Sequence, residues 1–259
     1  MIAAKTFNLF GLNIPFYGLL MAVAFLLAFF IVRTLFKKKG ELNPDITFDL
    51  LLIIFPLSII GARLYYVIFS GRAWSFVEVL SVWDGGLAIY GGIIGGLLGV
   101  VIYALIKKIN IFKLTDTIAP ALILGQAIGR IGCYFSGCCY GLEVTNPDLM
   151  WFPLSTNIDG VWHLSTYFYE SFWSILGFIL LIIVYNKNKQ NGLTTGLYLS
   201  FYGLGRFLIE GLRGDSLYIG ALKVSQVLSL ILIFVGIFIV VYSFVLKKKA
   251  KSNEQKQIG

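Results

Sequence analysis

The sequence predicts an all-α polytopic membrane protein with seven transmembrane helices and a small outer cap loop. Of the 259 residues, 58% are hydrophobic and only 13% are charged, and the mean hydropathy is +0.84. A soluble domain carries about 25% charged residues. Long uncharged runs also recur at close to the ~20 residues that a helix needs to cross a bilayer. We expect one integral membrane domain over residues 1–259.

Seven hydrophobic runs are the candidate transmembrane helices. They cover residues 16–36, 48–69, 87–106, 117–135, 167–185, 195–212 and 224–246. The fourth and sixth runs are less apolar than the others, and they contain Arg130 and Arg206. The first run is too long for a cleavable signal and positive charge follows it, so we expect an anchor.

The lysines predict the orientation of these helices. Of 15 lysines, 13 lie in four clusters that follow the first, third, fifth and seventh runs. Lysine-rich loops face the cytoplasm, so the N-terminus is expected outside and the C-terminus in the cytoplasm. The longest outer loop, about residues 140–166, is long enough for a small cap. The lysine- and glutamine-rich tail, about residues 247–259, is expected to be disordered.

Several function classes are not supported by the sequence. The net charge of +8 is spread over four loops without a basic stripe, which argues against nucleic acid as a partner. No catalytic-triad order, Walker loop or dinucleotide fingerprint is present. Cys133, Cys138 and Cys139 form no pair of C-x-x-C motifs, and His163 is the single histidine. We therefore expect no metal site and no cofactor, with the cysteines as small apolar fillers.

Apart from Arg33, which adjoins the first lysine cluster, four of the six arginines lie inside the hydrophobic runs or at their rims: Arg63, Arg130, Arg206 and Arg213. An arginine in the apolar zone costs at least ~2.5–3.5 kcal/mol on insertion scales, so it usually faces a partner or a polar cavity. These arginines therefore indicate a site.

Spacings of four and three residues place Arg206, Glu210 and Arg213 on one helix face. Two interpretations stay open, a structural ion-pair ladder and a guanidinium site that holds a phosphate in two-pronged geometry. Two arginines against one glutamate leave a positive surplus. With Arg130 and Arg63 added against Glu170 and Asp84, the set suits a lipid phosphate.

The third hydrophobic run is rich in glycine. Gly91, Gly95 and Gly99 share one helix face, which predicts close helix packing. Tyr90 precedes them, and close backbone approach would leave room for a ligand beside its phenol.

The motifs resemble those of the bacterial prolipoprotein diacylglyceryl transferase family, in order and over nearly the whole chain. The matching segments are Phe16-Tyr17-Gly18-Leu19, Gly61-Ala62-Arg63-Leu64-Tyr65-Tyr66-Val67, Trp83-Asp84-Gly85-Gly86-Leu87 with Gly91-Gly92, Gly125-Gln126-Ala127-Ile128-Gly129-Arg130-Ile131-Gly132, Tyr169-Glu170-Ser171 and Arg206-Phe207-x-x-Glu210-x-x-Arg213.

The resemblance implies an enzyme of the bacterial cytoplasmic membrane. It would transfer the diacylglyceryl group of phosphatidylglycerol to the lipobox cysteine of a prolipoprotein signal peptide, leaving a thioether and glycerol phosphate. Arg130, Arg206 and Tyr90 would be catalytic. Binding of phosphatidylglycerol would involve a larger set, Tyr17, Arg130, Gly141, Glu170, Arg206, Glu210 and Arg213.

Three positions depart from the family pattern: Tyr90 replaces histidine, Cys133 replaces asparagine and Cys138 replaces glutamate. A tyrosine with a pKa near 10 is a poor base unless arginines lower that pKa. Two alternatives therefore stay open. One is a divergent transferase with another acceptor or lipid, and the other is a non-enzymatic lipid-binding or transport protein.

Overall fold

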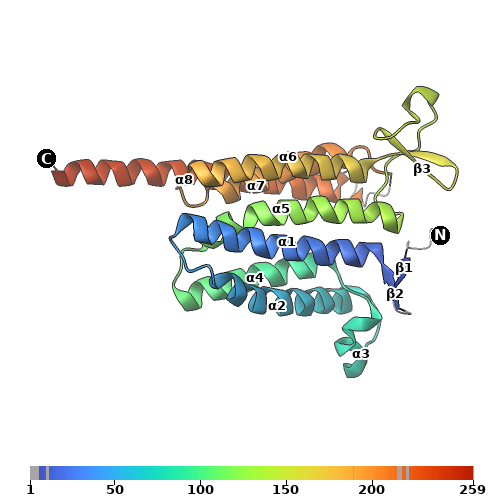
Figure 1. Ribbon diagram of the computed structural model, residues 1–259, viewed down its shortest axis with the longest axis horizontal. Helices are drawn as coiled ribbons and strands as arrows, with labels where there is room; N and C mark the ends of the chain where they lie inside the picture. The colour runs from blue at the N-terminus through green and yellow to red at the C-terminus, as the bar shows by residue number, and fades with distance from the viewer. Residues whose placement is uncertain (1–5, 10–11, 189, 215–217, 220–221, 259) are drawn as a thin grey trace. The chain divides into compact units, whose positions relative to one another are not determined.

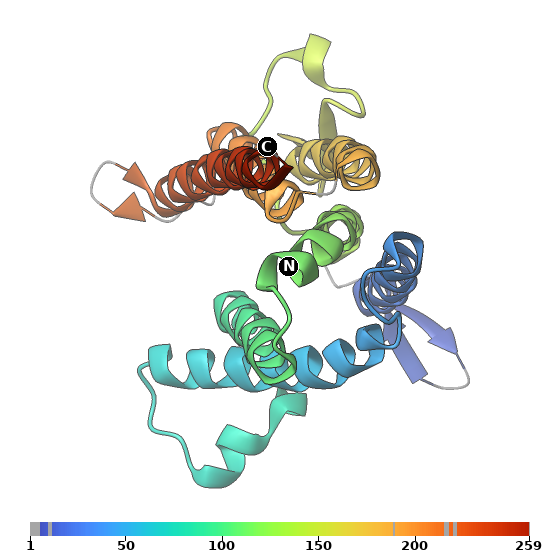
Figure 2. The same cartoon turned by 90° about the vertical axis from the view of Figure 1, so that its left-hand side faces the viewer.

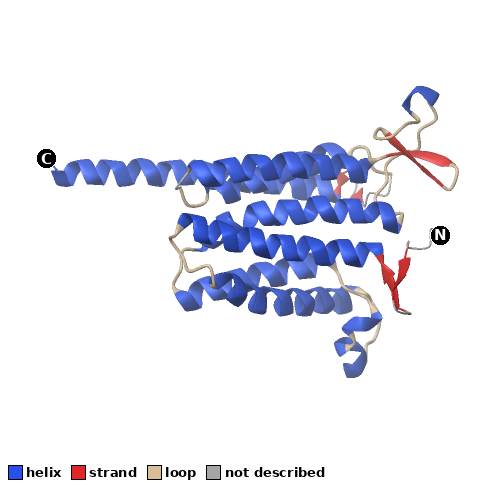
Figure 3. Ribbon diagram, viewed as in Figure 1, coloured by secondary structure: helices blue, strands red, loops and turns tan. Residues whose placement is uncertain are grey.

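The computed structural model describes residues 6–9, 12–188, 190–214, 218–219 and 222–258. Helices dominate, and the described strands form three two-stranded antiparallel hairpins (Figure 3). The chain divides into two compact units. One unit is Val32–Thr115, and the other combines Met1–Ile31 with Asp116–Gly259. The single domain expected from the sequence stays a prediction.

Within the Val32–Thr115 unit, close packing of two helices forms the core. The elements here are the end of α1 (Phe16–Lys39), α2 (Ile46–Phe69), α3 (Phe76–Leu80), the 3-10 turn η1 (Val82–Asp84), α4 (Ile89–Lys107) and the start of α5 (Ile111–Ser136). A Cβ added to Gly91 would lie 2.2 Å from the carbonyl oxygen of Gly61, and one added to Gly95 would lie 2.1 Å from that of Leu57. The predicted glycine packing face is therefore confirmed, and it joins α4 to α2.

The larger unit contains the first part of α1 and most or all of four further long helices. These are α5, α6 (Thr166–Lys187), α7 (Leu193–Glu210) and α8 (Val224–Ile258). Figures 1 and 2 both show α7 beside α6 and α8. A Cβ on Gly236 of α8 would lie 2.4 Å from Ser200 Oγ of α7, so these two helices also approach through glycine.

A buried carboxylate fixes the start of α7. Asp116 accepts hydrogen bonds from the backbone N–H groups of Gly192 and Thr195, both at 2.7 Å, and from the Thr195 hydroxyl at 2.6 Å. A carboxylate at a helix N-terminus satisfies N–H groups that have no partner within the helix. Asp116 of α5 thereby sets where α7 begins.

Each of the seven predicted spans lies on a helix, but six helices are long and apolar enough to cross a membrane. These are α1, α2, α4, α5, α6 and residues Val224–Lys248 of α8. The exception is α7, which has 18 residues, among them Arg206 and Glu210. The class of polytopic helical membrane protein is confirmed for the part of the chain that the structure describes, and the seventh span stays a prediction.

The long loop after α5 carries a small β-structured cap. It contains the 3-10 turn η2 (Pro147–Leu149) and the hairpin of β3 (Ser155–Ile158) and β4 (Val161–Leu164). In Figure 1 this hairpin projects past the ends of α5 and α6. The other two hairpins are β1 (Thr6–Leu9) with β2 (Leu12–Pro15) and β5 (Tyr218–Ile219) with β6 (Leu222–Lys223).

The C-terminal tail, expected from its composition to be disordered, is assigned to α8, which continues to Ile258; the disorder stays a prediction. Alanine, lysine, glutamine and glutamate are good helix formers. Extending an existing helix also avoids the cost of nucleating a new one. Composition alone indicates disorder, because it takes no account of the long helix that the tail directly follows.

Candidate functional site

The centre of the candidate site is the carboxylate of Glu170, which is only 7% exposed. Its Oε2 lies 2.6 Å from Arg130 Nε, and its Oε1 lies 2.7 Å from Arg206 Nη1 and 3.5 Å from Arg213 Nη1. Three guanidinium groups from α5, α7 and the segment after α7 thus converge on one acid of α6. Of the larger set grouped from the sequence, the structure brings these four residues together, while Arg63 and Asp84 belong to the other unit.

A second carboxylate extends the cluster. Glu210 Oε2 lies 2.7 Å from Arg206 Nη2, the i,i+4 pair expected on one helix face. Lys223 Nζ donates to the carbonyl oxygens of Glu210 at 2.8 Å and Arg213 at 3.0 Å. Glu210 and Arg213 are both buried. A buried charge is stable only when it is paired or hydrogen-bonded, so each of these groups depends on the others.

Among the described side chains of this cluster, three guanidiniums face two carboxylates. Asp215, which follows this segment, lies outside the described residues. Arg206 is the central member, since it contacts both acids. An incoming phosphate offers the same paired oxygens as a carboxylate and can be held by the same two-pronged geometry.

Gly141 positions the segment that carries Arg213. It forms an isolated antiparallel bridge with Arg213, and the Leu142 N–H donates to the Leu212 carbonyl at 2.9 Å. A Cβ at Gly141 would lie 2.7 Å from the Leu212 oxygen. The close approach requires glycine, so its contribution here is backbone packing that holds Arg213.

Tyr17 belongs to the same unit as the cluster. It lies at the start of α1, with its ring against α5. A Cβ added to Gly132 would lie 2.9 Å from Tyr17 Cδ2. The ring therefore covers the last turns of α5, close along the chain to Arg130.

The other predicted catalytic residue, Tyr90, belongs to the Val32–Thr115 unit. It lies in the first turn of α4, about half exposed, with its ring 6.3 Å from that of Tyr65. Its catalytic role stays a prediction.

The guanidinium of Arg63, expected to add to the positive charge of the site, binds backbone carbonyls of its own unit. Arg63 also lies in the Val32–Thr115 unit and is 4% exposed. Its Nε donates to the Val79 carbonyl at 3.1 Å, and its Nη1 donates to those of Gly85 at 2.6 Å and Gly86 at 3.1 Å. Its Nη2 donates to the Glu78 carbonyl. Arg63 is therefore a structural residue that fixes the loop between α2 and α4.

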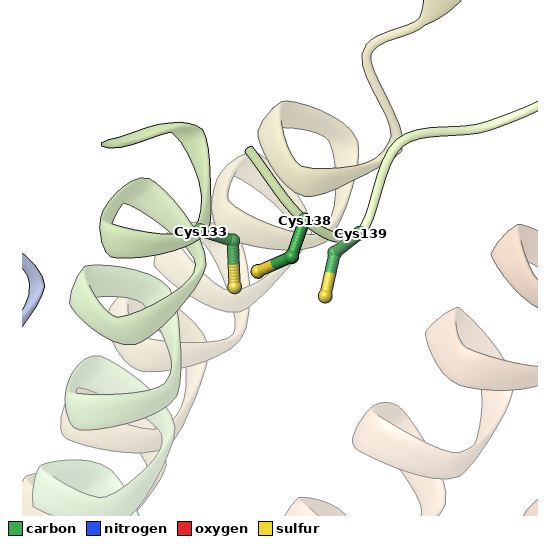
Figure 4. A group of neighbouring side chains, drawn as sticks. All are labelled: Cys133, Cys138 and Cys139. Carbon is green, nitrogen blue, oxygen red and sulfur yellow. The ribbon is translucent and has the colours of Figure 1, made fainter. Parts of the chain in front are cut away.

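The three cysteines lie beside the cluster, and sequence reasoning did not predict their convergence. Figure 4 shows their side chains pointing toward one another at the end of α5. The three sulfur atoms lie within 4.8 Å of one another, and Cys139 Sγ accepts from Arg130 Nη1 at 3.3 Å. Hydrogen bonds with Cys133 and Cys138 lower the pKa of the Cys139 thiol, and Arg130 acts in the same direction. Only the turn after α5, which sequence spacing does not reveal, brings these residues together.

Fold and site together define a polytopic helical membrane protein with arginines gathered around two buried glutamates. The family model described as prolipoprotein diacylglyceryl transferase matches residues 4–242, and the chain belongs to this family.

Relatives of the chain carry the same description. It is 40% identical over 243 residues to the phosphatidylglycerol–prolipoprotein diacylglyceryl transferase of Listeria welshimeri, covering 90% of this chain and 86% of that protein. It is 40% identical over 242 residues to transferase 1 of Clostridium perfringens, covering 91% and 92%. For the Streptococcus agalactiae transferase the identity is 38% over 248 residues, covering 93% and 96%.

Proposed function

We propose that this protein transfers the diacylglyceryl group of phosphatidylglycerol to the lipobox cysteine of prolipoproteins. The observation that carries the proposal is the convergence of Arg130, Arg206 and Arg213 on Glu170. Membership of the family and the names of the relatives support the substrates and the reaction.

The reaction is a displacement at carbon. The thiolate sulfur of the acceptor attacks the glyceryl carbon that carries the phosphate ester, forming a C–S bond as the C–O bond breaks. Glycerol phosphate leaves with the electron pair. The thiol proton passes to a base or to water, because an unperturbed thiol has a pKa near 8.5. Guanidiniums aimed at the leaving phosphate stabilise its growing charge in the transition state.

The cluster suggests a role for each of its members. Arg130 and Arg206 form a clamp that holds the phosphate. The carboxylate of Glu170 pairs with both guanidinium groups until the lipid arrives. Glu210 keeps Arg206 in place, and Arg213 adds a further positive group at the rim of the site. Tyr17 packs against the last turns of α5, close along that helix to Arg130. Tyr90 belongs to the other unit, and its role as the candidate proton acceptor rests on the family resemblance alone.

The membrane arrangement is also part of the proposal. Seven spans, with α7 as the sixth, would place the N-terminus outside and the C-terminus in the cytoplasm of a bacterial cytoplasmic membrane. The clamp would then lie near the outer headgroup level, where lipid phosphates are found. The β3–β4 cap would cover it on the side where secreted acceptors arrive.

A direct assay tests the reaction. Purified protein is mixed with a lipobox peptide and phosphatidylglycerol vesicles, and the peptide mass is followed. We expect a diacylglyceryl adduct and released glycerol phosphate, and none with phosphatidylethanolamine vesicles. If the peptide stays unmodified while the Listeria welshimeri relative modifies it in the same vesicles, the proposal is wrong. A divergent transferase, motivated by Tyr90, Cys133 and Cys138, would then be favoured.

A further inference from the structure

The end of α5 is built as a turn that returns the chain onto its own last helical turn. The Cys138 N–H donates to the Cys133 carbonyl at 3.1 Å, and the Gly137 N–H donates to the Tyr134 carbonyl at 3.3 Å. Gly137 has a left-handed φ of 60°. These two bonds around a left-handed glycine form a Schellman motif. The motif places Cys138 directly over Cys133, five residues earlier.

Cys139 is turned toward the same point by a backbone conformation that few side chains adopt. Its φ is 62°, in the left-handed region that is uncommon for residues other than glycine, asparagine and aspartate. The Thr166 hydroxyl donates to its carbonyl at 2.8 Å, which holds the turn against α6. Left-handed positions on both sides of Cys138, at Gly137 and Cys139, thus direct three thiols inward from one short segment.

The spacing of the sulfur atoms suits a bound metal ion. All three lie within 4.8 Å of one another, and the cysteines are free thiols. A metal–sulfur bond of about 2.3 Å places three trigonal sulfurs about 4 Å apart. A sub-ångström adjustment of the side chains is therefore sufficient for an ion to bind all three.

The cluster is accessible and has a counter-charge. A cavity of about 160 Å³ is lined by Cys133 and Cys138 together with Thr156, Asn157 and Tyr167 of the cap and α6. Cys138 is exposed, so an ion can enter from this side. On the other side, Arg130 Nη1 contacts Cys139 Sγ at 3.3 Å. A guanidinium at that position offsets the negative charge of a metal–thiolate group.

We propose that Cys133, Cys138 and Cys139 form a binding site for one monovalent copper ion. Thiolate sulfur is a soft ligand that selects soft ions such as Cu(I). A structural zinc ion needs four ligands. In the part of the chain that the structure describes, no histidine or carboxylate joins the three sulfurs in this group. A three-sulfur set satisfies Cu(I) and leaves zinc short of one ligand.

Competition for copper tests the proposal on the full-length chain in detergent, under anaerobic reducing conditions. The protein is titrated against the Cu(I) complex of bicinchoninate, and loss of the chelator's colour reports transfer. We expect one equivalent of Cu(I) per chain. X-ray absorption of the loaded protein should show sulfur neighbours only. Because the chain has three cysteines in all, no other thiol competes.

Two variants keep the test decisive. Cys138→Ser changes an exposed residue, and we expect it to weaken copper binding by about 100-fold or more, since loss of an outer partner of a metal ligand already costs about 10–100-fold. His163→Gln removes the single histidine and should leave copper binding unchanged. Absence of copper uptake, equal uptake by the two variants, or tighter binding of zinc than of copper would each overturn the proposal. None of these outcomes depends on transfer activity.

Discussion

The two units bury arginine in opposite ways. In the Val32–Thr115 unit, Arg63 donates to four backbone carbonyls of a single loop. In the other unit, Arg130 and Arg206 are held by the carboxylate of Glu170. Carbonyls are fixed parts of the chain, so an arginine bound to them stabilises the fold. A carboxylate can be replaced at a guanidinium by another anion, so an arginine bound to it is available for a phosphate.

The largest effect is expected from the clamp itself. Arg130→Ala or Arg206→Ala should lower the rate of diacylglyceryl transfer by at least about 100-fold, since removing one preorganised charge-stabilising donor costs that much. Arg206→Lys should recover little, because an ammonium lacks the two-pronged geometry. Transfer is measured by peptide mass in phosphatidylglycerol vesicles. Arg33→Ala is the control, as Arg33 pairs with the exposed Asp45. Full activity of either alanine variant would show that the substituted arginine does not hold the phosphate.

Arg63→Ala should instead weaken the fold. Four backbone carbonyls would lose their donor, which we expect to lower the free energy of unfolding by about 3 kcal/mol or more. Thermal unfolding in detergent should show a lower Tm, and Arg63→Lys should stay close to the alanine variant because one ammonium cannot reach all four carbonyls. The folded fraction should keep its transfer rate per molecule. If the Arg63→Ala variant kept a normal Tm but lost transfer, Arg63 would belong to the site, and the contrast between the two kinds of buried arginine would be wrong.

Asp116→Asn tests the same distinction on a carboxylate in place of an arginine. Asp116, like Glu170, is a buried carboxylate of the larger unit, but it binds backbone N–H groups and a hydroxyl. Replacing it should lower stability by about 1–2 kcal/mol, as loss of a helix cap does, without changing transfer. Glu170→Gln, in contrast, should alter the Michaelis constant for phosphatidylglycerol. Equal effects of the two substitutions on that constant would contradict the distinction.

The smallest effect concerns pH and the loop that Arg63 holds. Hydrogen bonds from the Ser75 backbone and side chain lower the pKa of Glu78 at the start of α3. A lowered folded-state pKa stabilises the helix at pH values above the ordinary glutamate pKa of about 4.3, and this contribution disappears as pH falls through the lowered value. The protection factors of the amides in residues 75–80, each corrected for the intrinsic exchange rate at that pH, should therefore fall in acid. Glu78→Gln should remove this pH dependence, and unchanged protection in the wild type would count against it.

The sequence predicted much of the site because its signals are local. Arg206, Glu210 and Arg213 share a helix face by spacing alone, and an arginine in an apolar run already demands a partner. The identity of the central partner was harder to obtain. Glu170 was assigned through motif order, but its contact with arginines from three segments depends on how α5, α6 and α7 pack.

The sequence could not separate Arg63 from the other arginines, since all four lie in or beside apolar runs. Only the return of residues 78–86 over α2 supplies the carbonyls that occupy its donors. The convergence of the cysteines could not be predicted for a related reason. Their spacing matches no common metal motif, and a left-handed turn brings their sulfurs together.

By itself, the sequence determined the helical membrane class, the positions of the helices and the candidate arginines, because hydrophobicity and charge act along the chain. The tertiary structure decided which arginines face carboxylates and which face carbonyls, and it brought the three thiols together. These outcomes depend on contacts between residues distant in sequence and on backbone turns. Composition and spacing do not encode these contacts, because the contacts depend on which groups the fold brings within hydrogen-bonding distance.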